Sequence, residues 1–203
     1  MGVQREESGT LANERLTATT GVALVALLLI EGVTIVFLRP LLPVHIFVGM
    51  LLIPPVALKL ASTGYRLLRY YTGHSVYVDR GPPHLVMRVL APLLVLATLG
   101  ILATGVLLLV LGPDNGRGIV LGLHKLSFIV WLSVAAVHVL VHLPRLPRLV
   151  LARRGAGRRL GLIAASVAAG LALAGATYSL AGPWLHRHEH GDDHRAAAQT
   201  FLG

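Results

Sequence analysis

Three histidines lie in one long apolar stretch of the chain, where polar side chains are costly. Residues 119–143 read IVLGLHKLSFIVWLSVAAVHVLVHL, a stretch long enough to cross a bilayer as one helix. It contains His124, His138 and His142. Histidines inside such a helix usually face other helices and have a function there. Neutral imidazole is a common ligand of metals, including haem iron, so this stretch indicates a candidate iron site.

The interval between the first two of these histidines decides how they lie relative to each other. His124 and His138 are 14 residues apart. On an α-helix this interval is about 21 Å along the axis, and it brings the two side chains to nearly the same face. His142 follows His138 by about one turn and lies close to that face. One helix of this kind can offer a ligand near each side of a membrane, one for each of two stacked haems.

The composition is that of an integral membrane protein. Of the 203 residues, 55% are hydrophobic and 13% are charged, which is not a soluble globular composition. The chain has no cysteine, which excludes disulfides, iron–sulfur clusters and thiolate chemistry. Its formal net charge of +9 comes largely from arginines between the apolar stretches. Such arginines indicate membrane orientation and not nucleic-acid binding.

Five apolar stretches predict an all-α membrane fold with five transmembrane helices. The expected spans are residues 21–38, 44–63, 85–111, 119–143 and 160–181. The fifth is dense in alanine and glycine and has no histidine, so we expect a peripheral helix that packs through its small residues.

The charges of the connecting segments predict the orientation of these spans. Residues 144–159 hold six arginines and no acidic residue, whereas residues 182–203 mix both signs. The positive-inside rule then places the N-terminus in the cytoplasm and the C-terminus outside, in a bacterial inner or plasma membrane. We expect residues 1–20 to be a flexible polar cytoplasmic segment, with a short interfacial helix at residues 13–16 as an alternative for its end. Residues 21–181 would form the transmembrane domain. Residues 182–203 would then be an extracytoplasmic tail.

Two histidines are expected at the same depth near the outer surface. His45 and His124 each lie near the start of a span that begins outside, so the two spans run parallel. An iron bound by both imidazoles needs their nitrogens about 4 Å apart, which two neighbouring helices can provide. We therefore expect His45 and His124 to be the axial ligands of an outer haem b. The alternative is that each histidine only forms a hydrogen bond between helices.

A second, inner haem has a less complete set of candidate ligands. The position 14 residues after His45 is Lys59, so the second span does not repeat the histidine interval. His84 and His74 remain as partners for His138, and His142 can replace His138. The sequence therefore predicts one haem b, with two as the alternative.

Charged residues near these histidines suggest two further roles. Lys125, Arg39 and Arg117 lie on the expected outer side and could bind haem propionates, although ordinary charge at the ends of spans explains them as well. Glu31 and Lys59 lie inside the first and second spans, where a charge needs a partner. They form an ion pair with each other, or they handle protons beside a redox centre.

The C-terminal tail is rich in histidine. Its histidines are His186, His188, His190 and His194. Together with the acidic residues among them they could bind Cu, Zn, Ni or Fe ions. Flexible histidine-rich tails also occur without a dedicated metal role.

The helical histidine pattern resembles that of bis-histidine b-type membrane cytochromes, the cytochrome b561-like and ferric-reductase-like group. The segment VHIFVGM at residues 44–50, followed by KLASTGYR at residues 59–66, looks like bacterial membrane proteins of that type. The likeness covers about residues 13–143. It implies a four-helix bundle that holds one or two haem b groups and passes electrons across or along the membrane. His45, His124 and His138 are the positions that carry over, and Lys59 departs from the pattern.

Three functions are open at this point. The first is a haem b electron-transfer protein or oxidoreductase subunit that works between a quinol or other donor and an extracytoplasmic acceptor. The chain has no G-x-G-x-x-G nucleotide motif, so this function would need a quinone or a redox partner subunit. The second is a metal-ion-handling membrane protein that uses the histidine-rich tail. The third is a non-catalytic membrane anchor subunit.

Overall fold

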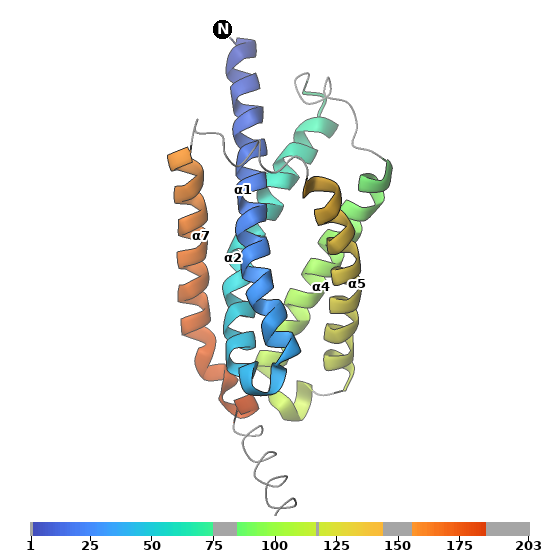
Figure 1. Cartoon of the computed structure of the whole chain (residues 1–203), viewed down its shortest axis with the longest axis vertical. Helices are drawn as coiled ribbons and strands as arrows, with labels where there is room; N and C mark the ends of the chain where they lie inside the picture. Colours follow the sequence, from blue (N-terminus) through green and yellow to red (C-terminus); the bar gives the residue numbers. More distant parts are fainter. Residues whose placement is uncertain (1, 75–84, 117, 144–155, 186–203) are drawn as a thin grey trace, which may run out of the picture.

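Long helices account for nearly all of the chain that the structure describes. The computed structural model describes residues 2–74, 85–116, 118–143 and 156–185 (Figure 1). Its elements are α1 (Gly2–Val36), α2 (Leu38–Tyr71), α4 (Leu85–Gly116), α5 (Ile119–His142), α7 (Ala156–Thr177) and the short helix η2 (Tyr178–Ala181). In this described part, 5 helices are long and apolar enough to cross a membrane. The all-α, multi-pass membrane fold expected from the sequence is thereby confirmed.

The first helix is much longer than the apolar stretch that predicts it. The polar residues 2–20, expected to be flexible, instead continue α1 without a break. Two of them have partners on α2, since the Asn13 side chain donates to the Ser62 carbonyl at 3.0 Å and Thr17 Oγ1 donates to Ser62 Oγ at 3.0 Å. These contacts extend the α1–α2 packing well beyond the apolar core. The expectation of a flexible segment was wrong. It rested on polar composition alone, which does not reveal hydrogen-bond partners on another helix.

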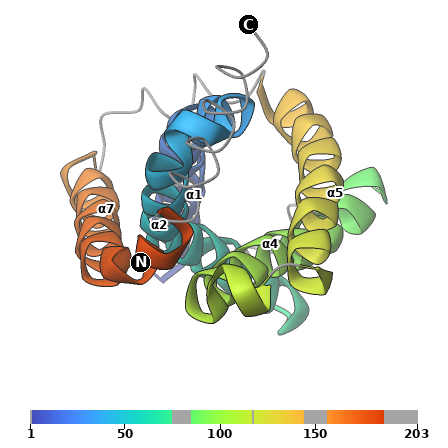
Figure 2. The ribbon, with the colours of Figure 1, turned by 90° about the horizontal axis from the view of Figure 1, so that it is seen from below.

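The helices form two pairs and a fifth, outer helix. Figure 2 looks along the bundle and shows α1, α2, α4 and α5 placed around its axis in chain order, with α7 outside them next to α2. The closest packing joins α4 to α5, α1 to α2 and α2 to α7, whereas α2 and α4 share a smaller contact. The bundle therefore consists of an α1–α2 pair and an α4–α5 pair that meet through α2 and α4.

The α4–α5 pair is fixed by its turn and by side-chain contacts. Helical geometry is broken at Gly112, whose φ of 68° is a conformation that glycine adopts without strain. The helices then run antiparallel, and Trp131 Nε1 donates to Thr98 Oγ1 at 3.0 Å. Oγ1 of Thr104 lies 3.0 Å from Nδ1 of His124. Since both contacts join the same two helices, they set which residues of α5 face α4.

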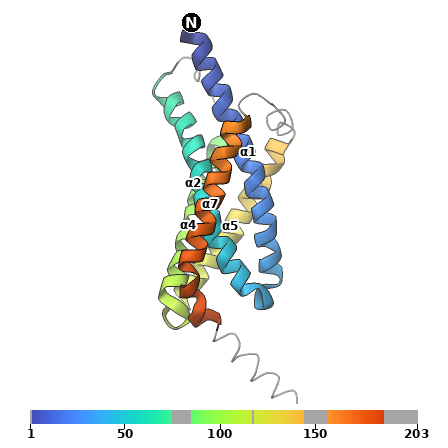
Figure 3. The same ribbon diagram turned by 90° about the vertical axis from the view of Figure 1, so that its left-hand side faces the viewer.

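The two ends of the bundle differ in what they hold (Figure 3). The α1–α2 connection, the turn at Gly112 and η2 lie at one end, which we call the His45 end. The start of α1 and the end of α5 lie at the other, which we call the His142 end. The described chain thus begins at the His142 end, and its last helix ends at the His45 end. Which end faces the cytoplasm stays a prediction of the positive-inside rule.

The fifth helix, α7, packs on α2 through small residues. A Cβ atom added to Gly170 would overlap the backbone carbonyl of Leu51, so the two helix backbones are in direct contact there. Ala174, one turn further on, is 1% exposed. Beyond α7, Trp184 Nε1 donates to the Leu108 carbonyl of α4 at 3.0 Å. The small residues of the fifth span therefore serve close helix packing, as expected from its composition.

We expect Gly170→Ala to lower the free energy of unfolding by about 1–3 kcal/mol, because the new methyl group overlaps a backbone that cannot move without shifting a helix. Gly175→Ala on the same helix is the matched control, since nothing lies within 4 Å of its added Cβ. The control should be neutral or slightly stabilising. Denaturant unfolding of both variants in detergent measures the difference, and equal effects would contradict the packing described here.

Candidate functional site

His45 on α2 is held by two polar side chains of α1. Its Nδ1 atom lies 2.9 Å from Oε1 of Glu31 and 3.2 Å from Oγ1 of Thr34. Thr34 Oγ1 itself donates to the Glu31 backbone carbonyl at 2.6 Å. Glu31 is 9% exposed and Thr34 is 1% exposed. The three residues form a buried polar group near the His45 end, which we call the Glu31 cluster.

His124 on α5 is held by the neighbouring helix α4. Its Nδ1 atom lies 3.0 Å from Oγ1 of Thr104, and that hydroxyl donates to the Gly100 carbonyl at 2.7 Å. A Cβ atom on Gly105 would lie 3.3 Å from Cε1 of His124. The absence of a side chain at Gly105 therefore gives the imidazole its space beside α4.

The two imidazoles approach each other across the bundle. The ring centroids of His45 and His124 are 6.5 Å apart, and the ring planes are at 82°. They come from α2 and α5, which are not one of the closely packed helix pairs. The structure thus brings together the two histidines that the sequence places at one depth. Their role as ligands stays a prediction.

The hydrogen bonds around these histidines favour a proton on Nδ1 in both rings. The Thr104 hydroxyl gives its one proton to the Gly100 carbonyl, so it accepts from Nδ1–H of His124. The Glu31 carboxylate is an acceptor, so Nδ1 of His45 is the donor in their contact. In a neutral imidazole the other nitrogen, Nε2, then carries a free lone pair. In the described part of the chain, Nδ1 of each ring contacts a side chain, and His124 also forms a hydrogen bond with the backbone of Ile101.

The histidines at the other end of α5 are arranged differently. The rings of His138 and His142 stack on each other with centroids 4.4 Å apart, and Nδ1 of His142 lies 2.9 Å from the His138 carbonyl oxygen. Nδ1 of His138 is buried without a hydrogen-bond partner in the described part of the chain. His84, the expected partner of His138, lies outside the described residues. The described part therefore shows no second pair of histidines facing each other from two helices.

Lys59 is bonded to the backbone of α1 and not to Glu31. Its Nζ donates to the Thr17 carbonyl at 2.6 Å. Gly21 leaves room for the ammonium group, because a Cβ there would lie 3.0 Å from Nζ. Thr17 and Glu31 are 14 residues apart on one helix, about 21 Å along its axis. The predicted ion pair between Glu31 and Lys59 was therefore wrong, since each residue has another partner at its own depth.

The remaining charged candidates are only partly described. Arg39, in the first turns of α2, and Lys125, next to His124, are both exposed. Their positions near the His45 end leave propionate binding as a prediction. Arg117 and the tail histidines expected to bind metal ions lie outside the described residues. Among the residues that are described, no group of 3 or more His, Cys, Asp or Glu could hold a metal ion.

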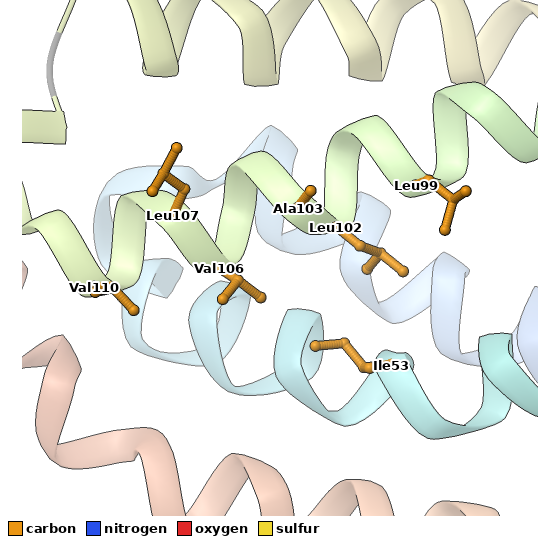
Figure 4. Close-up of a pocket in the computed structure, with 7 residues that line it drawn as sticks. All are labelled: Ile53, Leu99, Leu102, Ala103, Val106, Leu107 and Val110. Atoms are coloured by element: carbon orange, nitrogen blue, oxygen red, sulfur yellow. The ribbon is translucent and has the colours of Figure 1, made fainter.

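An apolar groove runs between α4 and α2 (Figure 4). It has a volume of about 580 Å³ and is lined by Ile53, Leu99, Leu102, Ala103, Val106, Leu107 and Val110. No histidine among the described residues lines the groove, and the apolar lining offers no group for chemistry.

Sequence reasoning missed the two threonines of the site. Thr34 and Thr104 each contact a histidine, but threonines in membrane helices commonly bond to their own backbone, as these two also do. One signal was present, because Thr34 follows Glu31 by three residues and so lies on the same helix face. No comparable signal marks Thr104, since its helix gives no indication of which face meets α5.

We expect Lys59→Met to change the free energy of unfolding by no more than about 1 kcal/mol, because the stem still packs and only one hydrogen bond to a carbonyl is lost. Lys59→Asp is the contrasting variant. It turns an acceptor toward the Thr17 carbonyl and should lower the free energy of unfolding by about 2 kcal/mol or more. Unfolding of both variants in detergent measures this, and equal losses would show that Lys59 has a different role.

No protein-family model matches the chain, and no match is found among the curated proteins or the solved structures.

Proposed function

We propose that this protein is a membrane haem b cytochrome that transfers electrons, with one haem bound between His45 and His124. The observation that carries this proposal is the separation of 6.5 Å between the two ring centroids. An iron bound to Nε2 of both rings, with bonds of about 2 Å, would set the centroids about 6 Å apart. The two rings therefore already stand at a spacing that suits two axial ligands.

The protons of the two imidazoles support the same proposal. A histidine that ligates iron through Nε2 needs its proton on Nδ1 and a partner that holds it there. Glu31 provides that partner for His45, and Thr104 provides it for His124. Two histidines that served only to join helices would need one hydrogen bond each and no particular spacing from each other. The spacing of the two rings favours ligation over that alternative.

The surroundings of the two histidines also suit a flat, largely apolar group. The site lies between the α1–α2 and α4–α5 pairs, where the helices are least closely packed. Gly105 lies beside His124, and Gly49 lies beside Glu31, the partner of His45. Arg39 and Lys125 are the exposed cations nearest in sequence to the two ligands, and in this proposal they bind the propionates.

Each part of this chain has a defined task in the proposed function. A bound haem supplies reversible one-electron transfer. Nε2 of each histidine would bind the haem iron, and the Nδ1 contacts hold each ring in one tautomer and orientation. By the positive-inside rule the His45 end is extracytoplasmic, which places the site near an acceptor on that side. A quinol or a redox partner subunit is the proposed donor, and a bacterial inner or plasma membrane is the proposed location.

We expect the detergent-purified protein to show a b-type reduced-minus-oxidised spectrum, with one haem per chain by pyridine haemochrome. His45→Ala and His124→Ala should each remove the Soret band, because a haem with one axial ligand and a cavity in place of the other binds weakly. His138→Ala and His142→Ala on the same helix are the matched controls and should retain it.

Two results would overturn the proposed site. A protein without haem after expression with ample haem supply would exclude the cytochrome proposal altogether. Loss of haem in His138→Ala with retention in His124→Ala would move the site to the His142 end. Two haems per wild-type chain, with some haem retained in His124→Ala, would support the inner haem as a second site.

A further inference from the structure

We infer that Glu31 is a positioning residue that makes the two axial ligands unequal and lowers the reduction potential of the haem held between them. This inference rests on the proposed function. It concerns a carboxylate that does not touch the iron and acts through Nδ1 of His45.

The two histidines have partners at nearly equal distances but of different charge. Nδ1 of His45 lies 2.9 Å from a carboxylate oxygen of Glu31. Nδ1 of His124 lies 3.0 Å from the hydroxyl oxygen of Thr104. A hydrogen bond to a charged acceptor is roughly twice as strong as one between neutral groups. The site therefore has one ligand with a strong partner and one with an ordinary partner.

Glu31 is placed so that His45 is its main partner. Glu31 lies in the last two turns of α1 and is 9% exposed. Lys59 is bonded to Thr17, about 21 Å along α1 from Glu31. Thr34 Oγ1 lies 3.2 Å from Oε2 but gives its shorter contact, 2.6 Å, to the Glu31 backbone. The Nδ1–H group of His45 is thus the closest donor to this carboxylate among the described side chains.

A carboxylate in this position changes the ligand in a known direction. It draws the Nδ1 proton toward itself, which makes Nε2 a stronger electron donor to iron. Its negative charge also stabilises the more positive ferric state in an apolar environment, where charges are weakly screened. Both effects favour the oxidised form. The Thr104 hydroxyl accepts a weaker hydrogen bond and carries no charge, so the carboxylate has the larger effect and favours loss of the electron.

The test is a potentiometric titration of the purified, haem-loaded protein. Glu31→Gln keeps the size and a hydrogen-bond acceptor but removes the charge, and Thr104→Val is the matched change at the other ligand. We expect Glu31→Gln to shift the ferrous-to-ferric ratio at fixed potential at least tenfold toward ferrous. For one electron this raises the midpoint potential by about 59 mV or more. Thr104→Val should shift it by clearly less.

The outcomes separate this inference from the function on which it rests. A wild-type protein that binds no haem overturns the proposed function before any variant is needed. A haem-loaded Glu31→Gln protein with an unchanged potential overturns only the inference, as does an equal shift in Thr104→Val. Where Glu31→Gln fails to hold haem, Glu31→Asp replaces it, since the shorter side chain keeps the charge but weakens the contact. Its potential should then rise, and an unchanged value contradicts the inference.

Discussion

The contact between Glu31 and His45 is the interaction on which this bundle most depends. Lipid offers no hydrogen bonds, so a polar side chain inside a membrane helix has to find its partner within the protein. Glu31 finds it on α2, and Lys59 finds its own on α1, about 21 Å along that helix from Glu31. The contact of Thr104 with His124 joins α4 to α5 in the same way. The polar groups that build the candidate site therefore also set the register of the helices around it.

This arrangement explains why the site lies between the helix pairs and not within one. Polar contacts join the two helices within each pair, whereas the α1–α2 and α4–α5 pairs share only a small contact between α2 and α4. His45 and His124 belong to different pairs, so a group bound by both would join them. Binding that favours only the folded arrangement adds to its stability. In the proposed function the cofactor is thus also part of what holds the two halves of the bundle together.

The sequence predicts the helices well because bilayer thickness and hydropathy set their number and approximate position. It also predicts the meeting of His45 and His124, because depth in a membrane restricts which residues can meet. It does not predict the partner of Glu31, since helix rotation decides which face of α1 meets α2. The Glu31–Lys59 ion pair failed because of depth, since Lys59 is bonded at Thr17, about 21 Å along α1 from Glu31. The helical residues 2–20 were missed because their partner, Ser62, is itself an ordinary polar residue in an apolar span.

The difference between the two ends of α5 follows from what stands opposite each histidine. His124 and His138 lie on nearly the same face of one helix, so helical spacing alone would give them the same role. His124 has His45 across the bundle, whereas the equivalent position of α2 is Lys59, whose ammonium group is bonded to α1. His138 instead stacks on His142 from its own helix. A pair of axial ligands needs two helices, and the described part of the chain provides that geometry at the His45 end.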